Sequence, residues 1–224
     1  MVEGTALARL RPESLAHVEA KNDEPLWQQR KSLATRNATL EAALQCLAES
    51  GYASCSLQVV ARRAGISRGA MLHHYASKLD LMGAVVEYAF YRRMAKFLDR
   101  IRELTEEERA VRNAGIAVSF EISQTAEYRA YLELHVASRT DADLRAIFLE
   151  RASLYQSVWR AEIEKVFPEW AGNSQLTLLD DFVWVMVDGL ALNVEIWADS
   201  ARVDAILNLV AKTITAIRDG NLRI

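Results

Sequence analysis

The chain has 224 residues, of which 51% are hydrophobic and only three are prolines, and its formal net charge is −3. With no long alternation of apolar and polar residues, this composition predicts an all-α fold of one or two domains and argues against a β architecture. Because no apolar stretch is long enough to cross a bilayer and no secretory signal is visible, we expect a cytoplasmic protein without a membrane partner.

The chain begins with an extension, residues 1–27, in which Pro12, Pro25 and mixed charges interrupt any helical period. We expect this extension to be mobile. The first long helix follows it and stops at Gly51, because glycine is common at helix ends. The apolar face of this helix consists of Leu33, Leu40, Leu44 and Leu47.

Two short helices joined by a tight turn are predicted next. Ser56 is a suitable N-cap for a helix over residues 57–64, and Gly65 ends that helix in the left-handed conformation that glycine adopts without strain. Ser67 caps the second helix, which runs to Tyr75. This spacing is typical of a helix-turn-helix that reads DNA, and a purely structural helical corner is the alternative. The small shared core is predicted to be Val60, Ile66 and Met71.

From residue 78 onward, the helical period of the apolar residues predicts further helices joined by short polar breaks. The first covers residues 78–102. A charged run, residues 105–112, opens the next helix, which we expect to kink at Gly115 and to continue to Phe120. The remaining predicted helices cover residues 127–138, 141–166, 176–197 and 203–218.

The charge is distributed unevenly along the chain. Residues 28–100 carry 11 Lys or Arg against 5 Asp or Glu, whereas residues 101–224 carry 13 against 20. Neutralising phosphates and releasing counterions supplies most of the sequence-independent affinity of proteins for DNA. A basic segment that coincides with the helix-turn-helix is therefore the electrostatic footprint that phosphate binding requires.

The stretch from Arg36 to Val86 resembles the DNA-binding domain of TetR-family transcriptional regulators. At one position the chain departs from the family pattern: Leu72 stands where the family usually has a tyrosine that touches a phosphate. That contact is then absent or supplied by a neighbour such as His73. The residues that carry the resemblance are Gly51-Tyr52, Ala61 and Gly65 of the hairpin, Gly69, and His74-Tyr75-x-Ser77-Lys78.

The resemblance implies a DNA-binding domain at residues 28–77, followed by a helical ligand-binding and dimerisation domain at residues 78–224. We expect Arg68, Gly69 and His73 to face DNA from the recognition helix. Lys78 is expected to anchor a phosphate, while Arg36 contacts the DNA backbone or a minor groove unless it is only a solvated helix end. The predicted DNA-binding residues are Arg36, Ser56, Ser67, Arg68, Gly69, His73, His74, Tyr75 and Lys78.

The late helices at residues 141–166 and 176–197 carry more apolar surface than one face of a bundle needs. The resemblance implies a homodimer built on two late helices of each subunit, so that two recognition helices enter successive major grooves of a palindromic site. The alternative is that all this surface is core within one chain. The two apolar stripes of the earlier helix are Leu144, Phe148, Tyr155, Trp159 and Ile163, and Ile147, Leu154 and Val158.

The resemblance also implies a pocket for a small-molecule effector in the second domain. Aromatic residues at helical spacing can line such a pocket, although they are more often plain core. Asp188 follows six apolar residues, shares a seven-residue spacing with Asp181 and Glu195, and is costly to bury unpaired. An ion pair across an interface or a solvated stripe is the favoured alternative for Asp188. The candidate ligand-binding residues are Phe120, Tyr128, Tyr131, His135, Trp159, Trp184, Met186 and Asp188.

No catalytic or metal-binding pattern stands out. Cys46 and Cys55 lack the spacing of a zinc site, and the adjacent His73 and His74 point to different faces of a helix. We therefore expect no enzymatic activity, cofactor or metal, and we expect reduced thiols, with a redox-sensing cysteine pair as the alternative.

The predicted function is a repressor that binds a palindromic operator as a homodimer. An effector would release it by moving the helix that starts at Lys78 and so changing the separation of the recognition helices. The alternatives are a helical interaction or scaffold protein without DNA binding, and a small helical enzyme.

Overall fold

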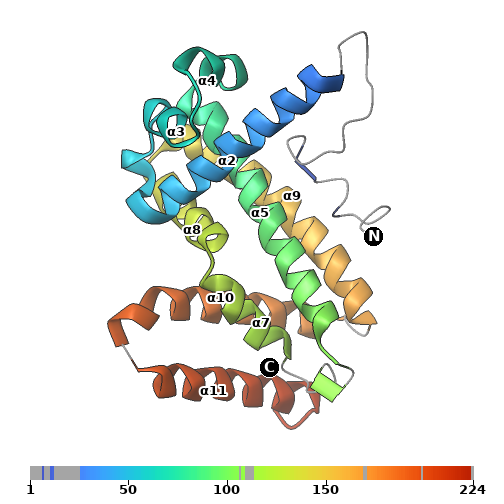
Figure 1. Ribbon diagram of the computed structural model, residues 1–224. Helices are drawn as coiled ribbons and strands as arrows, with labels where there is room; N and C mark the ends of the chain where they lie inside the picture. The colour runs from blue at the N-terminus through green and yellow to red at the C-terminus, as the bar shows by residue number, and fades with distance from the viewer. Residues whose placement is uncertain are drawn as a thin grey trace. The chain divides into compact units, whose positions relative to one another are not determined.

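The computed structural model describes residues 7, 11–12, 26–105, 107–108, 114–168, 171–197 and 199–222. These residues form nine helices and no strand, so the predicted all-α fold is confirmed for them (Figure 1). The helices are α2 (Leu26–Ser54), α3 (Leu57–Arg63), α4 (Arg68–His74), α5 (Lys78–Glu103), α7 (Ala114–Ser123), α8 (Ala126–Ser138), α9 (Ala142–Val166), α10 (Ser174–Trp197) and α11 (Ser200–Arg218).

Most predicted helix boundaries agree with the structure to within a few residues. The predicted end of the first helix at Gly51 is a break inside α2, where Gly51 has φ 77° and ψ 170°. The helix predicted from Thr105 falls largely on residues 106 and 109–113, which lie outside the described residues. Helix α7 begins at Ala114 and continues past the predicted end at Phe120.

The chain divides into two compact units. The first comprises residues 1–94 and 126–162, and the second comprises residues 95–125 and 163–224. The predicted domain boundary between residues 77 and 78 stays a prediction, because the two units divide the chain differently.

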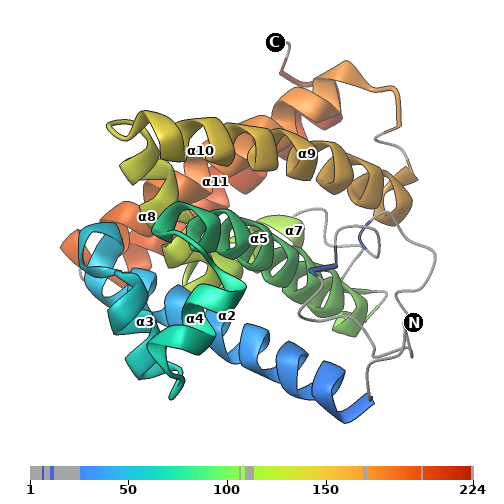
Figure 2. The same ribbon diagram turned by 90° about the horizontal axis from the view of Figure 1, so that it is seen from above.

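In the first unit, α3 and α4 lie on one side of α2, as Figure 2 shows. The leucines predicted to face the core from α2 are buried, except for the half-buried Leu33. Arg92 of α5 and the buried Glu127 of α8 form an ion pair with a separation of 3.0 Å between nitrogen and oxygen. The unit also includes Leu7 of the N-terminal extension, which is buried and donates its backbone N–H to Glu162 of α9 at 3.2 Å. Most of the extension lies outside the described residues.

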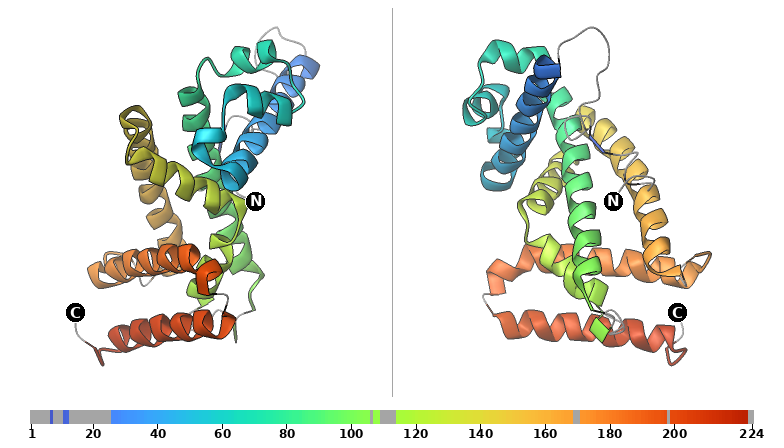
Figure 3. Two further views of the ribbon diagram at one scale, coloured as in Figure 1. Left: turned by 90° about the vertical axis from the view of Figure 1, so that its left-hand side faces the viewer. Right: turned by 45° about the vertical axis from the view of Figure 1, so that its right-hand side comes forward.

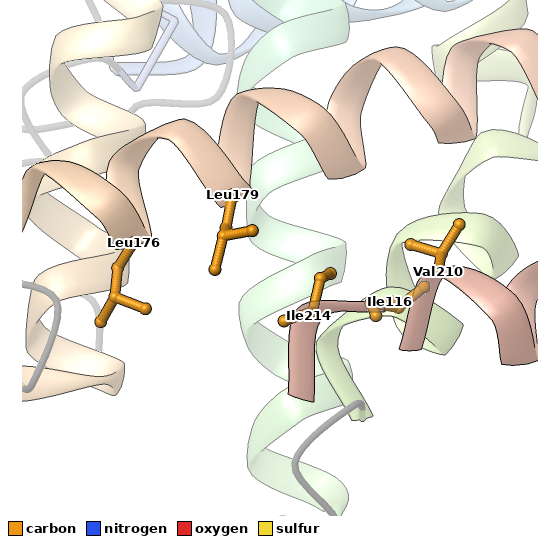
Figure 4. Close-up of a cluster of buried hydrophobic side chains, with 5 residues drawn as sticks. All are labelled: Ile116, Leu176, Leu179, Val210 and Ile214. Carbon is orange, nitrogen blue, oxygen red and sulfur yellow. The ribbon is translucent and has the colours of Figure 1, made fainter. Parts of the chain in front are cut away.

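The second unit is built on α7, α10 and α11, and α10 and α11 run side by side in opposite directions (Figure 3). Residues from all three helices form a buried apolar cluster (Figure 4). This cluster consists of Ile116, Leu176, Leu179, Val210 and Ile214.

Cys46 and Cys55 are buried free thiols within the first unit. Burial raises the pKa of the Cys55 thiol to about 12, and its hydrogen bond with Cys46 acts in the same direction. Because thiolates rather than thiols react with oxidants, the buried Cys55 thiol is protected in the folded state. Among the described residues, none of the helices is long and apolar enough to cross a membrane, and no group of three or more potential ligands could hold a metal ion.

Candidate nucleic-acid interface

The helix-turn-helix has the caps predicted from its sequence. The side chain of Ser56 accepts the Val59 N–H at 3.3 Å, and that of Ser67 accepts the Ala70 N–H at 3.1 Å, so each serine satisfies a backbone donor at the start of a helix. Gly65 has φ 68°, in the left-handed region that favours glycine. The sequence therefore fixes the start of both short helices and the turn between them.

The core of the hairpin is close to the one predicted. Val60 and Met71 are buried, whereas Ile66 is only half-buried. Tyr75 ends α4 and is 8% exposed, and burial raises the pKa of its hydroxyl. Tyr75 is therefore part of the core beneath α4 and exposes little surface, and its predicted contact with DNA stays a prediction.

The outer face of α4 is exposed. It presents a guanidinium from Arg68, an apolar side chain from Leu72 and an imidazole from His73, with no side chain at Gly69. A Cβ added at Gly69 would meet only the Ser67 Oγ, at an ordinary contact distance of 3.9 Å. The fold itself therefore does not require glycine at position 69.

His74 lies on the inner side of α4 and is half-buried. Its pKa is lowered, mainly by desolvation and then by the charges of Arg36 and His73. Arg36 of α2 thus lies close enough to the end of α4 for its charge to act on His74, and its predicted contact with DNA stays a prediction.

His74 gives a testable dependence of stability on pH. The ordinary pKa of histidine is 6.5, and the folded value lies below it. As the pH falls through this range, the unfolded chain takes up a proton that the folded chain does not, so the free energy of unfolding should decrease. His74→Gln should remove this contribution. In an NMR titration, a His74 midpoint in the folded protein equal to or above that in the urea-unfolded chain would contradict the prediction.

Lys78, predicted to anchor a phosphate, has another contact in this structure. Its Nζ donates to the Tyr52 carbonyl oxygen at 2.6 Å and lies 3.7 Å from the centre of the Tyr52 ring. Ser77 caps α5 as predicted and accepts the Asp80 N–H at 3.0 Å. The contact between Lys78 and a phosphate stays a prediction, and the contact with Tyr52 is one that the sequence did not predict.

The predicted ligand-binding residues are divided between the two units. Tyr128, Tyr131, His135 and Trp159 belong to the first unit, whereas Phe120, Trp184, Met186 and Asp188 belong to the second. Three of the first group join an aromatic cluster between α5, α8 and α9. Its other rings are Phe90, Phe148 and Tyr155.

A buried arginine, Arg93, lies within this aromatic cluster. Its guanidinium is 4.7 Å from the centre of the Tyr128 ring and 4.4 Å from that of Tyr131. The Tyr155 ring stacks on Phe90 with 4.1 Å between centres. The Tyr155 hydroxyl is buried and has no hydrogen-bond partner among the described residues. His135 is exposed and stacks on Phe148.

Comparison with known families shows what the hairpin is similar to. Residues 40–85 match the family model described as bacterial regulatory proteins, tetR family. An uncharacterized HTH-type transcriptional regulator from Mycobacterium tuberculosis is 30% identical over 118 residues, which cover 53% of this chain and 60% of that protein. The regulator CymR from Pseudomonas putida is also 30% identical over 118 residues, covering 53% of this chain and 58% of CymR. The chain thus matches less than two thirds of the length of these relatives.

A longer match is to the HTH-type transcriptional repressor AcnR from Corynebacterium glutamicum. It is 24% identical over 183 residues, which cover 80% of this chain and 92% of AcnR. Among solved structures, a TetR transcription regulator from Haloarcula marismortui has a TM-score of 0.58 and 20% identity, covering 83% of this chain and 97% of that one. The multidrug binding protein EbrR, complexed with imidazole, has a TM-score of 0.53 and 22% identity, covering 78% and 93%. These structures share the fold of the described helices.

Proposed function

Because this chain belongs to the TetR family of helix-turn-helix transcriptional regulators, we propose that it binds a palindromic DNA operator as a homodimer and represses transcription until a small molecule releases it. The family consists of transcriptional regulators and not of enzymes. The observation that carries the proposal is the outer face of α4, where Arg68, Leu72 and His73 are exposed on a helix capped at both ends.

Each of these side chains has chemistry suited to a major groove. The guanidinium of Arg68 can donate two hydrogen bonds to guanine, and Leu72 can contact a thymine methyl group. The missing side chain at Gly69 allows the helix to approach the DNA closely. Ser56 and Ser67 cap the two short helices, and their predicted contacts with DNA, like those of His74 and Tyr75, stay predictions. Arg36 and the N-terminus of α5 at Lys78 are the proposed phosphate contacts.

Homodimerisation is supported by an exposed apolar stripe on α10. Its members are spaced three or four residues apart and therefore lie on one face of the helix. Gly189 occupies the one position of this series that lacks an apolar side chain, between Val185 and Leu192. Asp181, Asp188 and Glu195 flank this face, which suits a polar margin of an interface better than a ligand contact. Helix α11 adds the exposed Leu209. The exposed stripe consists of Leu178, Phe182, Val185, Leu192 and Ile196.

Helix α9, one of the two helices predicted for the interface, has fewer exposed large apolar residues. They are Leu149 and Leu154, while Val158 is half-buried. We therefore propose α10 and α11 as the dimer interface, in which these two helices of one subunit pack against the same two helices of the other.

The effector is proposed to bind against the aromatic cluster of α5, α8 and α9. The Tyr155 hydroxyl offers a buried polar group to a bound molecule, and the surrounding rings offer apolar contacts. Effector binding there is expected to shift α5 and weaken operator binding. Since coupling between two sites is reciprocal, a compound that binds at this cluster and leaves DNA affinity unchanged would contradict this part of the proposal.

The proposed function is tested by selecting duplexes from a random DNA pool with the purified protein. A palindromic sequence should be enriched, and its affinity should exceed that of random DNA by roughly 10³- to 10⁷-fold. The affinity should also fall steeply as the salt concentration rises, because phosphate contacts release counterions. If no sequence is enriched and no duplex is bound at moderate salt, the alternative of a helical interaction protein is favoured.

A further inference from the structure

The corner between α2 and α3 is held by groups from three other helices of the first unit. At this corner Gly51 breaks the helical path of α2, and a Cβ at position 51 would lie 3.1 Å from the Glu133 Oε1 of α8. The break frees the N–H of Tyr52 from the helix, and this N–H donates to the same Glu133 oxygen at 2.6 Å. Glycine is therefore required here both by its backbone angle and by the approach of a carboxylate.

The hydroxyl of Tyr52 reaches a second helix. It donates to Asp141 Oδ2 at 2.9 Å, while Asp141 Oδ1 accepts the Leu144 N–H at 2.9 Å and so caps α9. Burial and the hydrogen bond to Asp141 raise the pKa of Tyr52 to about 12. Hydrogen bonds from the Leu144 N–H and then from Tyr52 lower the pKa of Asp141. These shifts are those of a neutral tyrosine donating to a carboxylate.

The third helix that contacts Tyr52 is α5, which does so through its first residue, Lys78. With the ammonium bonded to the Tyr52 carbonyl and lying over its ring, every polar group of Tyr52 is engaged. Its N–H binds α8, its hydroxyl binds α9, and its carbonyl and ring bind the first residue of α5. We call Tyr52, Lys78, Glu133 and Asp141 the corner cluster.

We propose that Tyr52 is a positioning residue for DNA binding, which fixes the helix-turn-helix on the α8–α9 hairpin through the corner cluster. The inference rests on the proposed function, because it gives α8 and α9 a route to the recognition helix besides the movement of α5. The α2–α3 corner directly precedes the helix-turn-helix, so releasing it allows α3 and α4 to reorient. A charge-assisted bond at each contact makes the arrangement specific.

The test compares Tyr52→Phe, Asp141→Asn and the double variant in the full-length protein. Phenylalanine keeps the ring under Lys78 and removes only the bond to Asp141, and asparagine is as good a helix cap as aspartate. Tyr91→Phe on α5 and Asp143→Asn in the first turn of α9 are matched controls. Both lie outside the corner cluster.

Two measurements decide the outcome. The first is the ratio of affinities for the selected operator and for the same duplex with one base pair inserted at its centre. Tyr52→Phe should lower this ratio by roughly 2- to 30-fold, because freer helix-turn-helix units tolerate a wrong spacing. The second is amide hydrogen exchange over residues 57–75, which should accelerate by a similar factor relative to Tyr91→Phe. The double variant should equal Tyr52→Phe, because Asp141→Asn only weakens the contact with the Tyr52 hydroxyl by removing the carboxylate charge, and this contact is already absent in Tyr52→Phe.

An unchanged spacing ratio, with or without faster exchange over residues 57–75, would overturn the inference, as would a mere loss of global stability. If the wild-type protein binds no duplex, the proposed function fails and the exchange measurement alone decides the role of Tyr52. If the wild-type protein discriminates spacing and Tyr52→Phe does so equally well, only the present inference fails.

Discussion

Replacing Val185 or Ile196 with aspartate is expected to make the protein monomeric and to weaken its binding to the selected operator by roughly 10²- to 10⁴-fold. Val185 is 70% exposed and Ile196 is 75% exposed on the apolar face of α10. A carboxylate at either position would be buried without a partner if this face were covered by a second subunit. A monomer contacts only one half of a palindrome, so it loses the gain from linking two binding events.

The measurements are sedimentation at micromolar concentration and operator binding by fluorescence anisotropy. Leu149→Asp on α9 is the matched control, because Leu149 is 56% exposed and lies outside the α10 face. It should leave both the dimer and operator binding unchanged. Dimerisation that survives both α10 changes and is lost with Leu149→Asp would assign the interface to α9. A wild-type protein that sediments as a monomer would refute the proposed dimer.

The helix-turn-helix could be predicted closely because its determinants are local. Ser56, Gly65 and Ser67 each act on backbone groups within a few residues of themselves, so their positions in the sequence are sufficient. The two faces of α10 could be predicted only in part. Its nearly continuous apolar sequence indicated burial from several sides, while the structure shows that one face packs inside the unit and the other is exposed.

The corner cluster could not be predicted from the sequence. Tyr52 is separated from Glu133 by 81 residues and from Asp141 by 89, and no local pattern indicates which distant carboxylates it meets. Gly51 is predicted from the sequence as a helix end, whereas Tyr52 enters the sequence analysis only through the family resemblance. The same limit applies to Lys78, whose place after an N-cap suggested a phosphate contact, since the carbonyl that it binds belongs to another helix.

Substitutions on the recognition helix are expected to separate DNA binding from folding. Arg68→Ala should cost about 1 to 3 kcal/mol of operator binding for each half-site and change binding to random DNA little, because a bidentate contact to a base edge is lost. Gly69→Ala should weaken operator binding as well, because its methyl group would stand between the helix and the DNA. The free energy of unfolding should stay the same or rise by up to about 1 kcal/mol, since alanine has the higher helix propensity.

These opposite effects at Gly69 make it the sharpest test of the DNA-reading face. A Cβ there meets nothing in the protein closer than 3.9 Å, so a loss of operator affinity in a fully stable Gly69→Ala variant must arise from contact with DNA. Gly115→Ala in α7 is the control for Gly69→Ala, and Arg129→Ala in α8 is the control for Arg68→Ala. Each makes the same substitution on a helix outside the helix-turn-helix. If Arg68→Ala and Gly69→Ala remain folded dimers with wild-type operator affinity, α4 does not read the operator, and the assignment of this face as the DNA-binding surface is wrong.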